Sequence, residues 1–141
     1  MKSVFISHKF TGLSFEEMDT FLSPVVRHYE DAGVPVFCSL YLEDWFKQQQ
    51  WDVDMIYERC CKQQELYEIT IGIIWSDSDS YGMSIELHRA ISLAKPYILL
   101  YKAGLENMER LDKYISSSVM IRSFANMEEY KICISNISDY Y

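Results

Sequence analysis

The sequence alternates short runs of apolar, strand-forming residues with longer stretches that carry apolar residues at helical spacing. Such alternation is typical of a parallel β-sheet whose two faces are both covered by helices. The runs expected to form strands are residues 4–6, 34–38, 69–75, 97–101 and 119–121. We therefore predict one α/β domain over residues 1–141, a flavodoxin-like three-layer sandwich with a five-stranded, mainly parallel sheet.

Capping residues indicate where the first two helices begin. Ser14 precedes an apolar stripe and has Glu17 three residues later, the pattern of a capping box. Gly33 suits the left-handed end of that helix, and Asp52 can cap the second one. Residues 39–51 show no regular pattern. Helical spacing returns in residues 83–94, 105–115 and 127–137.

Composition and charge exclude several classes of function. The chain has 141 residues, 49% of them hydrophobic, which is enough for one core and too little for a second. Its net charge of −8 repels a phosphate polymer, so we expect no DNA or RNA partner. No apolar run approaches the ~20 residues of a membrane span, and residues 1–6 already have a strand pattern. We expect no membrane partner.

The cysteines and histidines show neither a CxxC pair nor the spacing of a zinc site. They are Cys38, Cys60, Cys61, Cys133, His8, His28 and His88. Four reduced cysteines are usual in a cytosolic protein, so we expect a cytoplasmic location, no metal and no cofactor.

Ligands of a parallel sheet collect at the carboxyl ends of its strands, which directs attention to residues 7–13, 39–51 and 76–83. Glu86 follows the third of these loops, and we expect it in the first turn of its helix. There the helix dipole would favour an ionised carboxylate. The functional reading is an active carboxylate facing the strand ends. The alternative is a glutamate that only complements the dipole.

Several segments resemble nucleoside 2-deoxyribosyltransferases and the related 2′-deoxynucleoside 5′-monophosphate N-glycosidases and CMP hydrolases. They are Phe5-Ile6-Ser7-His8, residues 69–75, Gly82-x-x-x-Glu86-Leu87 with Ala90, and Lys95-Pro96. The resemblance spans residues 3–123. It implies that Glu86 attacks the anomeric carbon of a nucleoside or nucleotide, or poises that attack, with hydrolysis if water follows and transfer if a second base does.

The same resemblance implies a second acid, usually an aspartate on the second helix. Cys60 stands where some of the hydrolases carry that aspartate, and a thiol is a poor substitute for a carboxylate. Glu58 and Glu68 are the two alternatives, so we expect the catalytic residues among Glu86, Glu58 and Glu68.

A 5′-phosphate is implied by Ser80, six residues before Glu86, and by Ser118, which matches a serine that these hydrolases take from a neighbouring subunit. We therefore expect a homodimer with a shared active site and a small nucleotide or nucleoside as ligand. Lys9 and His8 supply donors for an anion. The predicted substrate-binding residues are Ser7, His8, Lys9, Phe10, Gly12, Trp45, Asp77, Asp79, Ser80, Gly82, Ser84 and Ser118.

Two other functions remain open. The opening Phe5-Ile6-Ser7-His8 also resembles TIR domains, which share the sheet and use a helix-borne glutamate to cleave NAD. Loss of the acid at Cys60 would instead suit a nucleotide-binding sensor without activity. The aromatic residues around Trp45 could form a lid over the base, or they could be core.

Overall fold

The computed structural model describes residues 3–9, 13–76, 81–105 and 120–140. The strands are β1 (Val4–His8), β2 (Val36–Phe37), β3 (Ile69–Ile74), β4 (Tyr97–Lys102) and β5 (Met120–Phe124). The helices are α1 (Phe15–Asp31), the 3-10 turn η1 (Ser39–Leu42), α2 (Glu43–Gln48), α3 (Val53–Leu66), α4 (Tyr81–Ser92) and α6 (Met127–Tyr140). The helix expected over residues 105–115 lies outside these ranges except for Leu105.

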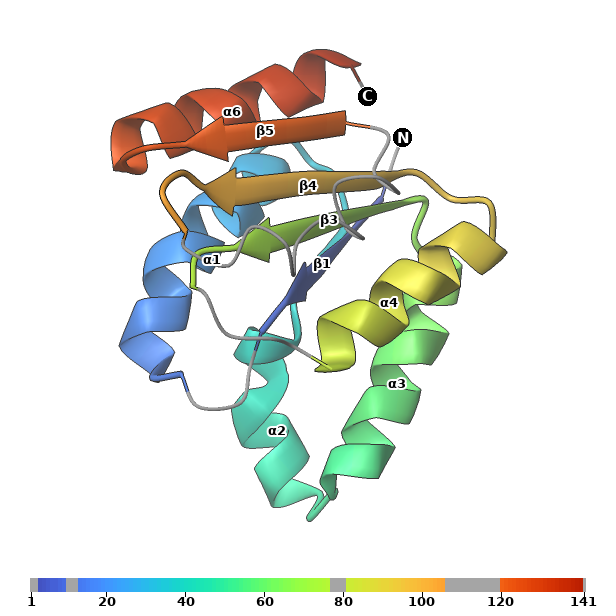
Figure 1. The fold of residues 1–141 in the computed structure, drawn as a ribbon. Coiled ribbons are helices and arrows are strands. Elements are labelled where there is room, and N and C mark those ends of the chain that lie inside the picture. Colours follow the sequence, from blue (N-terminus) through green and yellow to red (C-terminus); the bar gives the residue numbers. More distant parts are fainter. Residues whose placement is uncertain (1–2, 10–12, 77–80, 106–119, 141) are drawn as a thin grey trace.

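Within these ranges the sheet has five parallel strands in the order β2-β1-β3-β4-β5. Figure 1 shows β1, β3, β4 and β5 side by side. The α/β fold with a flavodoxin-like parallel sheet is thus confirmed. The strand order reverses between β1 and β3, because the chain first moves outward to β2 and then returns to the other side of β1. Ligands of such sheets bind at the carboxyl ends of the strands beside that reversal.

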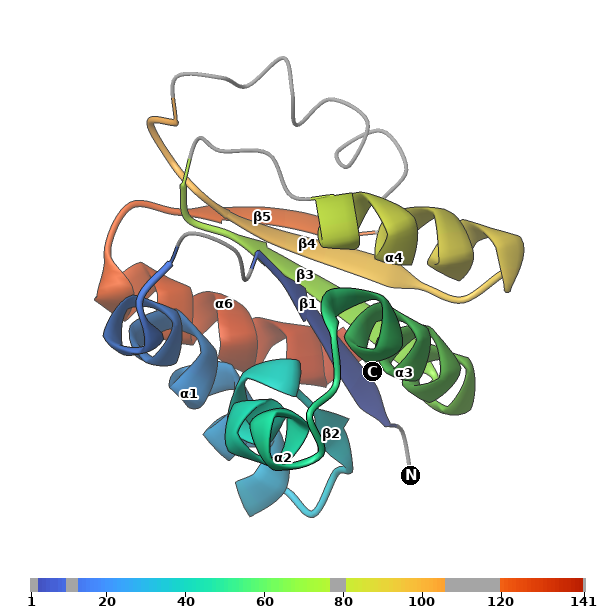
Figure 2. The same ribbon diagram turned by 90° about the horizontal axis from the view of Figure 1, so that it is seen from below.

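Helices cover both faces of the sheet, with α1 and α6 on one side and α3 and α4 on the other (Figure 2). Successive strand residues point to opposite faces. Val4 and Ile6 of β1 accordingly pack with α1 and α6, whereas Phe5 packs with Phe37 and with Cys60 of α3. Ser7 is therefore on the α3–α4 side of the sheet.

The predicted caps are confirmed. The Ser14 hydroxyl accepts a hydrogen bond from the Glu17 N–H at 3.1 Å, and the Asp52 carboxylate accepts one from the Met55 N–H at 2.9 Å. Gly33 follows α1 with φ of 73°. These local signals fix where α1 begins and ends and where α3 begins.

The structure differs from the sequence-based prediction around the second strand. That strand has only two residues, because the Val34 N–H bonds to Tyr29 O at the end of α1 and Cys38 O accepts from Tyr41 in the turn of η1. Residues 39–48, expected to be irregular, form η1 and α2. No helix of the described chain is long and apolar enough to cross a membrane.

Gly72 in β3 provides space for the ring of Tyr97 in β4. A Cβ at Gly72 would lie 2.2 Å from the Tyr97 hydroxyl oxygen and 2.8 Å from Cζ, closer than real atoms approach. Tyr97 is almost fully buried and belongs to the cluster of Met83, Leu87 and Ala90 under α4. The absence of a side chain at Gly72 therefore decides how α4 sits on the sheet.

We predict that Gly72→Ala lowers the free energy of unfolding by about 1–3 kcal/mol, because the Tyr97 ring has to move within a packed core. Urea unfolding monitored by circular dichroism measures this loss. Tyr97→Phe in the same background should recover part of it. Gly33→Ala, with positive φ but nothing within 4 Å, is the control and should cost only ~1 kcal/mol of backbone strain. Equal stability of Gly72→Ala and the parent would contradict the packing argument.

Candidate active site

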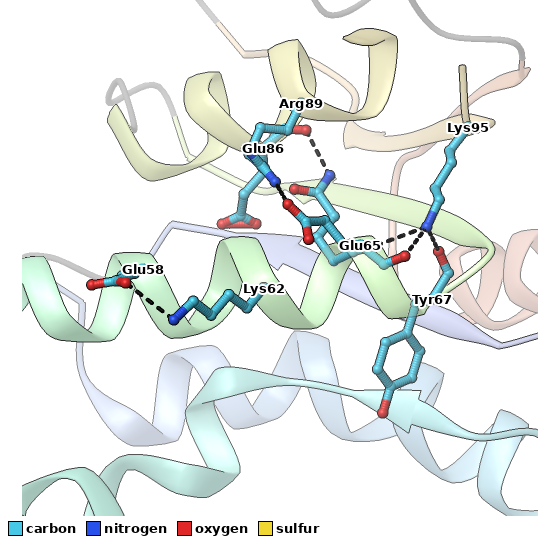
Figure 3. A network of polar contacts seen from close by, with 8 residues as sticks. Glu58, Lys62, Glu65, Tyr67, Glu86, Arg89 and Lys95 are labelled. Atoms are coloured by element: carbon cyan, nitrogen blue, oxygen red, sulfur yellow. Dashed lines mark hydrogen bonds and ion pairs between the residues drawn. The ribbon is translucent and has the colours of Figure 1, made fainter. Parts of the chain in front are cut away.

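Glu86 lies in the second turn of α4, which begins at Tyr81, and not in the first turn as expected. Its side chain points from α4 toward α3 and the sheet (Figure 3). The helix dipole acts mainly within the first turn, so it contributes little at this position. The helix dipole therefore cannot be the cause that keeps Glu86 ionised, as the sequence-based prediction assumed.

The ionisation state of Glu86 is also the reverse of the expectation. Burial raises the pKa of its carboxyl from 4.5 to about 8, and the nearby Ser7 hydroxyl opposes this only in part. Neither Glu86 Oε2 nor Ser7 Oγ, both inaccessible to water, completes a hydrogen bond of ordinary geometry with a described residue. At neutral pH the carboxyl is predominantly protonated, which is how an unpaired buried acid avoids the cost of its charge.

Cysteines surround the Glu86 carboxyl. Burial raises the pKa of Cys38 and of Cys60 to about 12, and the electrostatic effect of Glu86 adds to it in both cases. Burial also raises the pKa of Cys61, where Glu86 acts in the same direction. These thiols are uncharged at neutral pH, so they add no negative charge beside Glu86. Cys60, the residue expected where a relative would carry an aspartate, is among them.

His8 ends β1 and is buried. Its Nδ1 lies 2.9 Å from Lys9 O and its Nε2 lies 3.3 Å from Ser39 Oγ. A carbonyl oxygen can only accept, so Nδ1 carries the proton and Nε2 accepts from the Ser39 hydroxyl. Burial lowers the pKa of His8 to about 4. His8 therefore supplies no positive charge for an anion at neutral pH.

Helix α4 is fastened to α3 by a network of polar contacts (Figure 3). The Gln64 amide donates to Glu86 O at 2.7 Å, and Arg89 forms an ion pair with Glu65. Lys95, just after α4, donates to three carbonyls at the end of α3: Gln64 O, Glu65 O and Tyr67 O. A lysine here also suits the negative end of the α3 dipole. The Lys95-Pro96 motif thus has a structural role.

Comparison with known proteins identifies the fold. No protein-family model and no curated protein matches the sequence. The CMP N-glycosidase BcmB of Clostridium botulinum superimposes with a TM-score of 0.69 at 18% identity, over 99% of this chain and 100% of the other. A 2-deoxyribosyltransferase from Bacillus psychrosaccharolyticus gives 0.59 at 17% identity, over 92% and 90%. A conserved protein from Enterococcus faecalis V583 gives 0.53 at 12%, over 97% and 87%.

The chain has the nucleoside 2-deoxyribosyltransferase-like fold. Identities this low establish the fold and not the activity. Within that fold, Glu86 stands at the strand-order reversal, where ligands bind.

The structure separates the other two predicted acids from Glu86. Glu58 is on the outer side of α3, where its side chain is 69% exposed and forms an ion pair with Lys62 at 3.1 Å (Figure 3). Glu68 is exposed and precedes β3, so it lies at the amino end of the sheet, opposite the strand ends beside Glu86. Neither lies beside the Glu86 carboxyl.

The remaining predicted residues divide into three groups. Ser7 lies beside Glu86, His8 follows it on the opposite face of β1, and Lys9 continues β1 at the carboxyl edge. Ser84 and Gly82 are in the first turn of α4. Trp45 is on α2, 40% exposed, with its ring against Phe46 and Trp51. The predictions for Phe10, Gly12, Asp77, Asp79, Ser80 and Ser118 fall outside the described residues.

Three residues of the site were missed from the sequence. Cys38 and Ser39 come directly after β2, where the ligand loop was placed without a role for either. Gln64 continues the buried face of α3 one turn after Cys60, and a glutamine at an apolar position was the available signal. In the ranges that the structure covers, no three His, Cys, Asp or Glu residues are grouped to hold a metal.

A cavity of about 310 Å³ lies apart from Glu86, at the outer edge of the sheet between α1, β2 and η1. Asp19, Arg27, Val36 and Tyr41 are among its lining residues, and the Tyr41 hydroxyl donates to Asp19 at 2.7 Å. Cys38 borders this cavity as well, and its thiol also feels the electrostatic effect of Glu86.

The raised pKa of Glu86 predicts a pH-dependent loss of stability. Below pH 4.5 the carboxyl is protonated in the folded and unfolded chain alike. Between pH 4.5 and about 8 it ionises only on unfolding, so stability falls through that window and the deficit is constant above it. Glu86→Gln should therefore be more stable than the parent above pH 8, by at most ~5 kcal/mol, and no more stable at pH 4.

Urea unfolding at pH 4, 6 and 9 measures this difference between variant and parent. Glu58→Gln is the matched control, because its exposed ion pair should change stability by no more than about 1 kcal/mol at any of these pH values. If the curves for Glu86→Gln and the parent run parallel from pH 4 to pH 9, the carboxyl is not buried as described.

Proposed function

We propose that this chain cleaves the N-glycosidic bond of a nucleoside 5′-monophosphate, releasing the free base and a (deoxy)ribose 5-phosphate, with Glu86 as the nucleophile. Hydrolysis is preferred to base transfer. The observation that carries the proposal is the buried carboxyl of Glu86, which lies beside Ser7 of β1 at the strand-order reversal and has one oxygen without a hydrogen-bond partner among the described residues. A buried acid with a strongly shifted pKa in such a position indicates a functional site.

The chemistry requires a carboxylate beneath the sugar. Breaking a C–N glycosidic bond develops positive charge at C1′, which an anionic oxygen stabilises and can capture as an ester. Glu86 is mostly protonated at neutral pH, so it has to lose its proton before it can attack. A sugar hydroxyl that donates to the unpaired Oε2 would lower the pKa and favour the ionised form.

The structural neighbours are consistent with this substrate class. One is named a CMP N-glycosidase and another a 2-deoxyribosyltransferase, and both span nearly the whole of this chain. We extend the chemistry of these neighbours to this chain because the reaction requires a carboxyl group in a site shielded from water, and Glu86 is buried in this way. Lys9 would carry the positive charge toward a 5′-phosphate, since His8 is neutral. The homodimer with Ser118 at a shared site remains part of the proposal.

The proposal is tested by incubation with ribo- and deoxyribonucleoside monophosphates, the parent nucleosides and NAD, followed by chromatography for free base. Release from a monophosphate supports the N-glycosidase. Release only from NAD would support the TIR-like reading instead. Tight binding of a monophosphate without release of base would support a sensor.

Glu86→Gln preserves size and removes the charge, so we predict that it folds and binds substrate while the rate of base release falls. Loss of the main charge contact in the transition state should cost at least ~3–4 kcal/mol, a decrease of about 10²–10³ or more in kcat. Glu58→Gln and Glu68→Gln are matched controls and should retain the parent rate within about twofold. A folded Glu86→Gln variant with near-parent kcat would exclude Glu86 as nucleophile.

The pKa of about 8 predicts the pH profile. Since only the ionised carboxylate attacks, kcat/KM should rise about tenfold per pH unit below pH 8 and level off above it. The profile of kcat should level off at lower pH, because bound sugar hydroxyls stabilise the carboxylate. The second ionisation of a substrate phosphate, near pH 6, is separated from this change. A kcat/KM that falls through pH 8 would show that Glu86 acts as an acid.

A further inference from the structure

Gln64 is an unusual residue for the position that it occupies. It is on the face of α3 that packs against the sheet and α4, and its side chain is fully buried. Its Nε2 donates to Thr70 Oγ1 at 3.2 Å and to Glu86 O at 2.7 Å, so one amide joins α3, β3 and α4. Its Oε1 is buried and has no hydrogen-bond partner among the described residues.

The orientation of the amide follows from its partner. A peptide carbonyl oxygen can only accept a hydrogen bond, so the Gln64 atom facing Glu86 O has to be the nitrogen. Within α4, that oxygen is also the normal acceptor for the N–H four residues later, at Ala90. The contact with Gln64 is therefore an addition to a completed helical bond and not the repair of an unsatisfied group.

The other contacts between α3 and α4 cannot set the position of Glu86 as closely. Met83, Leu87 and Ala90 pack on the sheet through apolar contacts, which have no preferred direction. The Arg89–Glu65 ion pair is partly exposed on both sides, and exposed pairs constrain a structure weakly. Among the described residues, it is the buried Gln64 side chain that bonds to the backbone of Glu86 itself.

We propose that Gln64 is a positioning residue for Glu86: its amide fixes the backbone of α4 so that the Glu86 carboxyl is held against Ser7. The effect of Gln64 on catalysis rests on the proposed function. Its effect on the position of the Glu86 carboxyl follows from the geometry alone. The buried Gln64 amide thus links one residue of α4 directly to α3.

The test compares the parent with Gln64→Met, which keeps the length of the side chain and removes its donor. The first readout is the ¹³C NMR titration of the Glu86 side-chain carboxyl, which needs no activity. Within the described part of the chain, the titratable groups that interact with Glu86 are Cys38 of the β2–η1 junction and Cys60 and Cys61 of α3, all left unchanged. Once released from its place, the carboxyl can move toward water, so its pKa should fall by at least about one unit.

The second readout is catalysis. We expect kcat of Gln64→Met to fall about tenfold or more while KM stays within about threefold, because a misplaced carboxyl still permits binding. Glu65→Gln removes the adjacent ion pair without touching the amide and is the matched control; it should keep the parent pKa and rate. Gln64→Glu, protonated when buried, can still donate to Glu86 O and should stay near the parent pKa. Gln64→Leu, which also lacks the donor, replaces Gln64→Met if that variant does not fold.

An unchanged Glu86 titration in Gln64→Met would overturn the inference, as would a Gln64→Glu variant shifted as far as Gln64→Met. A loss of activity that only follows the folded fraction would also overturn it. A parent that titrates near pH 8 and shifts in Gln64→Met, but releases no base, would uphold the positioning role and reject the proposed function. The two ideas can thus fail separately.

Discussion

The packing of α4 against β3 and β4, next to α3, is the constraint on which this site depends. Gly72 leaves room for the Tyr97 ring, and α4 rests on that ring through Met83, Leu87 and Ala90. A helix packed this closely brings its second turn over β1, so a carboxyl at Glu86 meets Ser7 instead of water. The burial of the Glu86 carboxyl therefore follows from how α4 packs on the sheet.

Much of the fold was predictable because its signals are local. The β-branched run of β3 and the caps at Ser14 and Asp52 act within a few residues, and all three were confirmed. The short β2 and the helix α2 were not predicted. Their form depends on how residues 34–48 meet the end of α1, and no periodicity in the sequence encodes that contact.

The location of Glu86 was predictable as well, because its place after a central strand is a topological rule. Its ionisation was not. The dipole argument used local sequence alone, whereas desolvation by α3 and the sheet depends on the tertiary structure and is the larger effect. The same limit applies to Glu58, whose exposure is set by which side of α3 faces the core. Gln64 could not be interpreted from local sequence either, because its hydrogen-bond partner, Glu86, is 22 residues away in the chain.

A buried, neutral glutamate and a nucleophilic one are compatible if the charge appears only when it is needed. Burial raises the free energy of the ionised Glu86 carboxylate, so a positive group beside it interacts with it strongly. A sugar with positive charge developing at C1′ is such a group, and its attraction is stronger in a site of low dielectric constant than in water. The thiols of Cys38 and Cys60, whose pKa values burial raises to about 12, add no negative charge beside the carboxylate. The feature that destabilises the folded chain at high pH is thus the one that would distinguish the transition state from the substrate.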